Sequence, residues 1–401
     1  MGFRSIKEIF IIGHGPSSSH TMGPYFATQY IIKKYKDKEI KKIDVTLFGS
    51  LALTGHGHLT DEIINLGLRD YVHDIYFDCT SKKKHPNTMT FVVHTKEGKY
   101  TEDVLSIGGG TILTKDNIKE LKQEEIYPHS TMKEIVDYCT NENISLYEYV
   151  ARHEDLDIVE YFVNVLRVMD EAVERGLMTE GYLPGNLKVK RKAKAMYDEM
   201  VNTQHSVNDV TMNVAINAFA VAEENASGGV IVTAPTCGSA GVIPGCIKYL
   251  RMRGVDDFNI IRGLMVAGLF GIVCKTNASV SGAEAGCQAE IGVACSMGAA
   301  MIAFCFGKSL IDTVQAAEIA LEHSLGLTCD PVEGYVQIPC IERCALYAMK
   351  AVNAVKLAIV IPDDDIHVSY DDSIKTMMKT GKDMNKKYKE TSLGGLAEIL
   401  K

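Results

Sequence analysis

Residues 291–306 read IGVACSMGAAMIAFCF, an unbroken run of apolar and small side chains between Glu290 and Lys308. With Gly307 the run reaches 17 residues, fewer than the roughly 20 that a membrane-spanning helix needs. The stretch therefore predicts a helix in the buried core of a soluble protein, where its alanines and glycines allow neighbouring helices to pack closely.

Helical patterns continue on both sides of this run. From Asp157 to Leu177 apolar side chains recur at helical spacing. Similar patterns occupy four further segments, at residues 211–222, 258–273, 309–321 and 341–358. The uncharged stretch 225–247 is broken by Pro235 and Pro244, so it too is expected in a protein core rather than in a membrane.

The first third of the chain alternates strand-like and helix-like segments. Two strands, one helix and a glycine turn are predicted there, at residues 43–48, 88–95, 60–66 and 106–111 respectively. The expected fold class is therefore α+β and multidomain. A small N-terminal α/β domain should cover residues 1–125, and a larger all-helical domain should cover residues 126–401.

Length and charge restrict the classes of function. A chain of 401 residues is long enough for two domains, and its 46% hydrophobic and 23% charged residues are ordinary for a globular protein. The net charge of -9 argues against nucleic acid as a partner, because phosphate binding needs a positive face. Residues 1–10 carry charges and no long apolar stretch, so we expect a cytoplasmic protein that binds neither membrane nor nucleic acid.

The first candidate site is residues 15–24, GPSSSHTMGP, which precede an apolar helical segment. The N–H groups and the positive dipole end at a helix start suit a carboxylate or a phosphate. The hydroxyl groups add donors, and His20 could act as an acid or a base. A single serine would be interpreted as a helix cap, but five successive polar residues, Ser17 to Thr21, favour a ligand site.

Two further segments could contribute polar groups. His58 follows glycines in GHGH, where backbone or ligand can approach closely, and it stands just before a predicted helix. Residues 224–244, ENASGGVIVTAPTCGSAGVIP, contain Asn225 and Thr236 where turns could direct them to one point. The same segment could equally be a loop that packs the helical core. The basic run 188–194 is expected to be a solvated face.

Eleven cysteines are many for a cytosolic chain, and nine of them follow residue 230. A disulfide framework would suit a small secreted domain, and no Cys-x-x-Cys is present to suggest a zinc ribbon. Four cysteines in helical patterns are expected to pack in the core: Cys274, Cys295, Cys305 and Cys344. In contrast, Cys287, Cys329 and Cys340 each lie at a break, where loops could direct three thiolates toward one ion. Cys237 lies in another turn.

The longer motifs resemble the iron–sulfur-dependent L-serine dehydratases from about residue 5 to Gly395. Four segments are similar to the β domain of that family: GPSSSHTMGP, GSLALTGHGHLTD, HPNT and SIGGG. Four others are similar to its α domain: LPGNLKVKRKA, ENASGGVIVTAPTCGSAGVIP, NASVSGAEAGCQAEIGVACSM and LGLTCDPVEGYVQIPCIER. Several of them exceed ten residues, so chance is not a serious explanation.

This resemblance implies a [4Fe–4S] cluster and an active site between the domains. The family's cluster thiolates fall in its GCQ, TCDP and PCIER motifs, which correspond here to Cys287, Cys329 and Cys340. The implied catalytic residues are Ser18, His20 and His58, with one histidine as the base. The implied substrate-binding residues are Ser17, Ser19, Thr21, Asn225 and Thr236. Two positions depart from the family: Leu59 replaces a glycine, and Cys237 replaces the asparagine of some relatives, which weakens the case for Cys237 as a ligand.

The implied reaction is elimination of water from L-serine, giving pyruvate and ammonia. Three thiolates leave one iron open, which can bind the substrate as a Lewis acid while a base removes the α-proton. Three alternatives remain: elimination of sulfide from L-cysteine, a pyridoxal-phosphate dehydratase with SIGGGT as its phosphate loop, and a non-catalytic amino-acid or redox sensor. No Ser-x-Lys-x-Arg type segment supplies the Schiff-base lysine that the second needs. We expect a homodimer with a small amino-acid substrate.

The end of the sequence gives one more expectation. Longer-tailed relatives often carry a terminal cysteine that caps the open iron, whereas the last cysteine here is Cys344. We expect the tail to shield the site only sterically, through Leu396 and Ile399, and the iron to be sensitive to oxygen.

Overall fold

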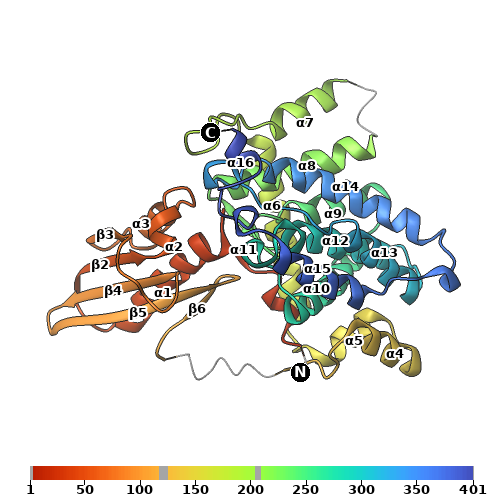
Figure 1. Cartoon of the computed structure of the whole chain (residues 1–401), viewed down its shortest axis with the longest axis horizontal. Helices are drawn as coiled ribbons and strands as arrows, with labels where there is room; N and C mark the ends of the chain where they lie inside the picture. The colour runs from red at the N-terminus through yellow and green to blue at the C-terminus, as the bar shows by residue number, and fades with distance from the viewer. Residues whose placement is uncertain (1–2, 117–124, 204–208, 401) are drawn as a thin grey trace. The chain divides into compact units, whose positions relative to one another are not determined.

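The computed structural model describes residues 3–116, 125–203 and 209–400, and the chain divides into two compact units (Figure 1). The smaller unit comprises residues 13–123 and 227–229 and contains a five-stranded sheet. The larger unit comprises residues 1–12, 124–226 and 230–401 and is mainly helical. A small strand-containing N-terminal unit followed by a larger helical unit confirms the predicted fold class.

The sheet of the smaller unit has the strand order β3-β2-β4-β5-β6. Its strands are β2 (Ile40–Phe48), β3 (His73–Asp78), β4 (Thr88–Thr95), β5 (Gly98–Gly108) and β6 (Thr111–Leu113). β2 and β3 run parallel, and the other neighbours are antiparallel. The two predicted strands are confirmed as β2 and β4. The predicted glycine turn joins β5 to β6, where residues 108–110 all have positive φ.

One face of this sheet is covered by helices. The helices are α1 (Gly23–Tyr35), α2 (Ser50–Thr54) and α3 (Thr60–Gly67), and α3 confirms the helix predicted at residues 60–66. Along β2 the buried side chains alternate with more exposed ones, as a strand with one face toward a core requires. Val45 and Leu47 of β2, Ile31 of α1 and Ile64 of α3 join the same buried core.

The larger unit contains every helix predicted for this part of the chain. Its helices are α4 (Met132–Glu142), α5 (Leu146–His153), α6 (Ile158–Met178), α7 (Ala193–Asn202), α8 (Val210–Ala226), α9 (Val242–Met252), α10 (Asp257–Asn277), α11 (Gly282–Ala285), α12 (Val293–Cys305), α13 (Leu310–Glu322), α14 (Cys340–Ala358), α15 (Tyr370–Asp383) and α16 (Leu396–Ile399). Shorter turns are η1 (Ile6–Glu8), η3 (Gln288–Gly292), η4 (Val332–Gly334), η5 (Asp363–Asp365) and η6 (Lys386–Tyr388). The remaining strands, β1 (Ile12–His14) and β7 (Val230–Val232), form a two-stranded sheet.

Helix α12 lies at the centre of the helical core and contacts α9, α10, α13 and α14. All of its residues from Val293 to Ala303 are buried. Glycine allows the close approach of its neighbours: a Cβ at Gly298 would lie 2.7 Å from the sulfur of Cys246 in α9. The same holds between α6 and α8, where a Cβ at Gly176 would lie 2.3 Å from a carbonyl oxygen. The close helix packing predicted from small residues is therefore confirmed.

Within the described ranges, two helical stretches are long and apolar enough to cross a membrane, Asp257–Asn277 and Gln288–Cys305. Their apolar windows are 78% and 83% buried inside the protein. Burial of this extent is typical of the core helices of a soluble protein, as the sequence predicted for the second stretch.

Candidate functional site

The serine-rich motif forms the first turns of a helix in the smaller unit. Ser17 is the N-cap, and its hydroxyl oxygen accepts a hydrogen bond from the His20 backbone N–H at 3.2 Å. Residues 18–22 form a π-helical turn, η2 (Ser18–Met22), that continues directly into α1. The motif is thus helical itself rather than a loop in front of a helix. π-turns of this kind are frequent at functional sites.

Two histidines lie side by side next to this turn. The ring centroids of His20 and His58 are 4.7 Å apart. Both ring nitrogens of His20 contact hydroxyl groups, Nδ1 at 2.8 Å from Ser19 Oγ and Nε2 at 2.9 Å from Ser50 Oγ. Nδ1 of His58 lies 3.1 Å from the carbonyl oxygen of Thr54. Because a carbonyl oxygen can only accept, Nδ1 of His58 carries the proton, and the lone pair of the neutral ring is on Nε2.

Both imidazole rings are neutral near pH 7. Burial lowers the pKa of His20 to about 3, assisted by His58 and opposed by the hydrogen bond to Ser50. Burial also lowers the pKa of His58, opposed by the hydrogen bond to Thr54. A neutral imidazole with a lone pair on Nε2 can accept a proton, so His58 has the properties of a general base.

Hydroxyl groups fix the backbone around the two histidines. Thr21 Oγ1 donates to the His58 carbonyl at 2.8 Å, and Thr60 Oγ1 donates to the His20 carbonyl at 2.6 Å. Ser106, at the SIGGGT turn, donates to the carbonyl of residue 19 at 2.7 Å. Sequence reasoning gave Thr60 only a place near a helix cap and gave Ser106 only a place in a glycine turn, and it assigned neither a role at this site. The turn at Ser106 leads into strand β6 rather than a helix, so it lacks the helix start that a phosphate loop uses.

The three serines of the motif differ in their contacts. Ser17 is buried and engaged as the helix cap, and Ser19 is hydrogen-bonded to His20. Ser18 is partly exposed, and within the described ranges its hydroxyl has no hydrogen-bond partner. Ser18 is therefore the hydroxyl most available to a ligand. The substrate roles assigned to these serines and to the buried Thr21 stay predictions.

The three cysteines of the predicted metal site lie at the ends of elements in the larger unit. Cys287 immediately precedes η3, and Cys340 is the first residue of α14. Cys329 lies in an extended segment that forms an isolated bridge with Lys389. The thiols of Cys287 and Cys329 are hydrogen-bonded to each other, and Cys340 interacts electrostatically with Cys287. The structure thus brings together all three side chains, although 42 residues separate the first two.

Arg343, in the first turn of α14, stabilises negative charge on this group. Its guanidinium donates to the Thr328 carbonyl at 2.8 Å and hydrogen-bonds the sulfur of Cys287. The hydrogen bond from Cys329 lowers the pKa of Cys287 to about 7, and Arg343 assists against the opposing effect of burial. The same thiol–thiol hydrogen bond, with burial, raises the pKa of Cys329 well above its ordinary value. The pair therefore holds one thiolate readily, and thiolate is the form that binds metal.

A carboxyl group that sequence reasoning did not single out adjoins the cysteines. Oε2 of Glu290 lies 3.7 Å from the sulfur of Cys329, and the Thr236 hydroxyl hydrogen-bonds the same carboxyl. Burial and the charge of Cys287 raise the pKa of Glu290 to about 8. Glu390 keeps contact with solvent, yet desolvation by the surrounding protein and the charge of Glu290 raise its pKa to about 8. The available sequence signal for Glu290 was its position as an acidic residue directly before the apolar run at 291–306.

This donor set fits an iron–sulfur cluster. Thiolate sulfur is the usual ligand of such clusters, and Arg343 offsets part of the negative charge that three thiolates bring. Gly282 keeps the group open: a Cβ there would lie 2.5 Å from Glu290 Oε2 and 3.1 Å from the sulfur of Cys329. Among the described residues, no three His, Cys, Asp or Glu side chains surround a point as the ligands of one metal ion do. Cluster ligands bind different irons, so they need not share such a point.

Comparison with known proteins identifies the family. The serine dehydratase beta chain family matches residues 5–76, and the serine dehydratase alpha chain family matches residues 87–397. The chain is 39% identical to L-serine dehydratase 2 of Escherichia coli (strain K12) and 38% identical to L-serine dehydratase of Haemophilus influenzae, each over 98% of both chains. It is 38% identical to L-serine dehydratase of Helicobacter pylori over 99% of both chains. The chain belongs to the serine dehydratase family.

The boundary between the two serine dehydratase family matches falls within the five-stranded sheet. The beta chain match ends at residue 76, within β3, and the alpha chain match begins at residue 87, next to β4. β2 pairs with both of these strands. The five-stranded sheet of this serine dehydratase is therefore built from sequence that belongs to both families.

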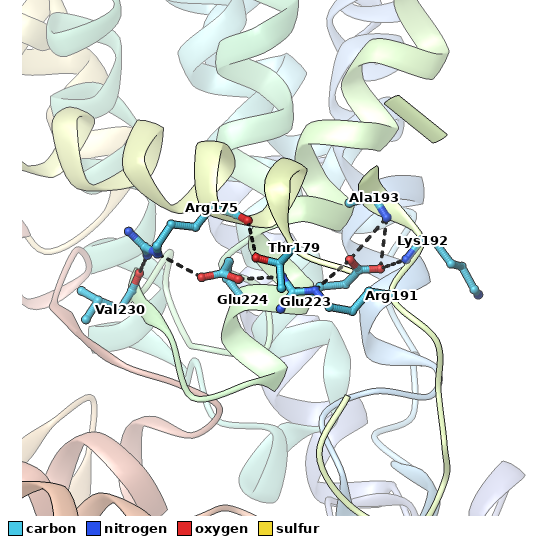
Figure 2. Close-up of polar contacts among 8 residues, drawn as sticks. All are labelled: Arg175, Thr179, Arg191, Lys192, Ala193, Glu223, Glu224 and Val230. Carbon is cyan, nitrogen blue, oxygen red and sulfur yellow. Dashed lines mark hydrogen bonds and ion pairs between the residues drawn. The ribbon is translucent and has the colours of Figure 1, made fainter. Parts of the chain in front are cut away.

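A buried ion network lies at the end of α8, next to the predicted substrate residue Asn225 (Figure 2). Arg191 contacts Glu224 at 2.6 Å and Glu223 at 3.6 Å, and Arg175 contacts Glu224 at 3.0 Å. The side chains of Arg191 and Glu223 are only 5% and 1% exposed. This network fixes the last turn of α8, which carries Asn225 in this serine dehydratase.

The basic run 188–194 is therefore not simply a solvated face, and the prediction is wrong for Arg191. Two carboxylates buried at the end of α8 need a cation, and Arg191 supplies it. Glu223 also accepts hydrogen bonds from the backbone N–H groups of Lys192, at 2.6 Å, and Ala193, at 3.3 Å, where α7 begins. The segment before α7 is thus held to α8 by charge and by backbone hydrogen bonds.

The glycine-rich segment 224–244 completes α8, forms β7 and enters α9. Thr236 contacts Ser239 at 3.2 Å between hydroxyl oxygens and also hydrogen-bonds Glu290, so it belongs to the cysteine group. Asn225 is 2% exposed at the last turn of α8. The substrate-binding roles of Asn225 and Thr236 stay predictions.

The cysteines predicted to pack in the core do so. Cys274, Cys295 and Cys344 are buried and Cys305 is half-buried. Burial raises the pKa of each of these four thiols to about 12, so they stay protonated. Burial and the charge of Glu290 also raise the pKa of Cys237, which favours its thiol form over the thiolate that a metal would need.

Proposed function

We propose that this protein is an L-serine ammonia-lyase, which converts L-serine to pyruvate and ammonia. The observation that carries the proposal is the convergence of Cys287, Cys329 and Cys340 beside Arg343 in a member of the serine dehydratase family. Loss of the α-proton and of hydroxide from L-serine gives 2-aminoacrylate and water. The imine tautomer of 2-aminoacrylate then adds water and yields pyruvate and ammonia.

The three cysteines would hold a [4Fe–4S] cluster and leave one of its irons without a protein thiolate. When bound, the cluster supplies a Lewis acid that stabilises the departing hydroxide. Arg343 would stabilise the bound thiolates, as it already stabilises that of Cys287. Cys329 would lose its proton on binding, because only a thiolate is a ligand.

Polar groups of the smaller unit would bind the substrate and move its proton. His58 is neutral and has a lone pair on Nε2, which supports it as the base for the α-proton. His20 lies against His58 and is tied to two hydroxyl groups, which supports a role in orienting the base. The partly exposed Ser18 would donate its hydroxyl to the substrate carboxylate.

Purification under strict anoxia, followed by iron and sulfide analysis and a serine-to-pyruvate assay, tests the proposal. We expect about four irons and four sulfides per chain together with pyruvate formation. Cys329→Ala should lose both the cluster and turnover. Cys295→Ala, a core cysteine of α12, should keep both and destabilise the fold by about 1–2 kcal/mol. A Cys329→Ala protein with a full cluster and full activity would contradict the ligand assignment.

The same anaerobic preparation also distinguishes the proposed lyase from a cysteine desulfidase, a sensor and a pyridoxal-phosphate enzyme. Faster release of sulfide from L-cysteine than of pyruvate from L-serine would identify a cysteine desulfidase. A full cluster without turnover of either amino acid would identify an amino-acid or redox sensor. An absorption spectrum of pyridoxal phosphate in place of a cluster would overturn the proposed chemistry altogether.

A further inference from the structure

Glu290 is held beside the cysteine group by contacts from three directions. Its Oε2 lies 3.7 Å from the sulfur of Cys329, and the Thr236 hydroxyl hydrogen-bonds the same carboxyl group. Glycines face it on two sides: a Cβ at Gly282 would lie 2.5 Å from Oε2, and a Cβ at Gly238 would lie 3.7 Å from Oε1. Its carboxyl group is therefore fixed in position, and the residue as a whole is half-buried.

A second carboxyl group is brought to the same place by the C-terminal segment. Cys329 donates its N–H to the Tyr388 carbonyl at 2.8 Å, and Glu390 donates its N–H to the Cys329 carbonyl at 2.8 Å. Ser392 Oγ donates to the Pro331 carbonyl at 2.7 Å. Glu390 has a φ of 57°, a left-handed conformation that non-glycine residues rarely adopt. Strained positions of this kind occur where a side chain is held for a function.

The carboxyl groups of Glu290 and Glu390 interact with each other electrostatically. In the part of the chain that the structure describes, neither forms an ion pair with a lysine or an arginine. In contrast, the nearby Asp330 does form an ion pair, since its Oδ1 lies 3.4 Å from the guanidinium of Arg343. Only Oε2 of Glu290 lies against Cys329, and its other oxygen, Oε1, faces Gly238, so the carboxyl group can accept further hydrogen bonds from a cationic N–H donor.

The substrate of the proposed reaction brings such a cation. L-serine carries an α-ammonium group with three N–H donors, and carboxylate oxygens are its strongest acceptors in proteins. We propose that Glu290, with Glu390 beside it, binds the α-ammonium group of the substrate and thereby selects amino acids over the corresponding hydroxy acids. The inference rests on the proposed function and assigns one subsite of its substrate.

The test compares L-serine with 3-hydroxypropanoate, which has the same carboxylate and hydroxyl but no amino group. In Glu290→Gln, the KM for L-serine should rise roughly 10- to 100-fold, the range expected for loss of a hydrogen bond to a charged group. The kcat should change much less, and the inhibition constant of 3-hydroxypropanoate should stay at the wild-type value. Glu390→Gln should show the same pattern more weakly, and iron and sulfide should be retained in both variants.

Glu284→Gln is the matched control, because Glu284 is an exposed carboxylate of the same segment that is hydrogen-bonded to Ser279. This control variant should leave the KM and kcat for L-serine and the inhibition constant of 3-hydroxypropanoate unchanged. A wild-type KM in Glu290→Gln, an equal rise in the constants for both compounds, or a loss confined to kcat would each overturn the inference while the proposed function stands. If Glu290→Gln loses iron, Glu390→Gln decides by the same comparison. Wild-type protein that forms no pyruvate would overturn the proposed function itself, and the inference with it.

Discussion

The imidazole rings of His20 and His58 lie 4.7 Å apart, and burial holds both in the neutral form. The pKa of His20 is about 3 in the folded chain and 6.5 without the fold. Between these values the unfolded chain binds a proton that the folded chain does not. The stability contributed by neutral His20 is therefore complete above pH 6.5 and is lost as the pH falls toward 3.

We expect His20→Asn to be less sensitive to acid than the wild type. The difference in unfolding free energy between the two should shrink by up to about 1.4 kcal/mol for each pH unit below 6.5. Urea unfolding of the full chain at pH 7.5, 6.5 and 5.5 measures this difference. His56→Asn is the control, because the side chain of His56 is 73% exposed. Parallel pH profiles for the wild type and His20→Asn would contradict the neutral assignment.

The histidine group should also control turnover without affecting the cluster. His58→Asn removes the proposed base, so kcat should fall by about 100- to 10,000-fold. His20→Ala and Ser18→Ala should likewise lower turnover by orders of magnitude. Iron and sulfide analysis of each variant accompanies the pyruvate assay, with His56→Asn again as the control. Loss of iron from these variants would show that the group supports the cluster and not the substrate.

The ion network at the end of α8 should contribute strongly to stability. Arg191→Met leaves the buried carboxylates of Glu223 and Glu224 without their principal cation, which should cost about 3–5 kcal/mol of unfolding free energy. Arg167→Met removes an exposed ion pair with Glu171 in α6 and should cost roughly 0.5 kcal/mol. Urea unfolding of the full chain compares the two. Equal effects would mean that the network is no stronger than a surface pair.

The two glycines that face Glu290 should respond differently to alanine. A Cβ at Gly282 would lie 2.5 Å from Glu290 Oε2 and 3.1 Å from the Cys329 sulfur, so Gly282→Ala must displace one of them. We expect substoichiometric iron and a loss of most turnover. A Cβ at Gly238 makes only ordinary contacts, the nearest at 3.7 Å, so Gly238→Ala should retain both. Full iron content in Gly282→Ala would show that the space around Cys329 is not needed.

The long helices were predictable because each buries a face along its own length. The pattern of residues 157–177 yields α6, and the apolar run at 291–306 yields α12. The edge strand β3 reads HDIYFD, with Asp74 and Tyr76 exposed and no buried residue, and it was not predicted. β5 was also missed, because its register depends on pairing with β4 and not on its own composition.

Some residues of the candidate site were likewise predictable from local sequence, and others were not. The cysteines and the SSSHT segment stand out because short motifs carry them. Glu290 does not stand out in the sequence, because its proposed role depends on Glu390, which is 100 residues further along the chain. Arg191 looked like one of several solvated cations, since the carboxylates that bury it come from α8, more than 30 residues away. Pairings across such distances are fixed by the tertiary fold and leave no local pattern.

Residues 3–12 obtain their packing partners late in synthesis. Backbone hydrogen bonds join Phe3 to Tyr127, and Ile6 packs so closely on Gly268 that a Cβ there would lie 2.9 Å away. At a ribosomal rate of about 5–20 residues per second, Gly268 emerges on the order of 10 to 50 seconds after Ile6. The strands of the five-stranded sheet are complete by Leu113. In the nascent chain the sheet can therefore form while the core side chains of residues 3–10, Phe3, Ile6, Ile9 and Phe10, still lack their partners in the larger unit.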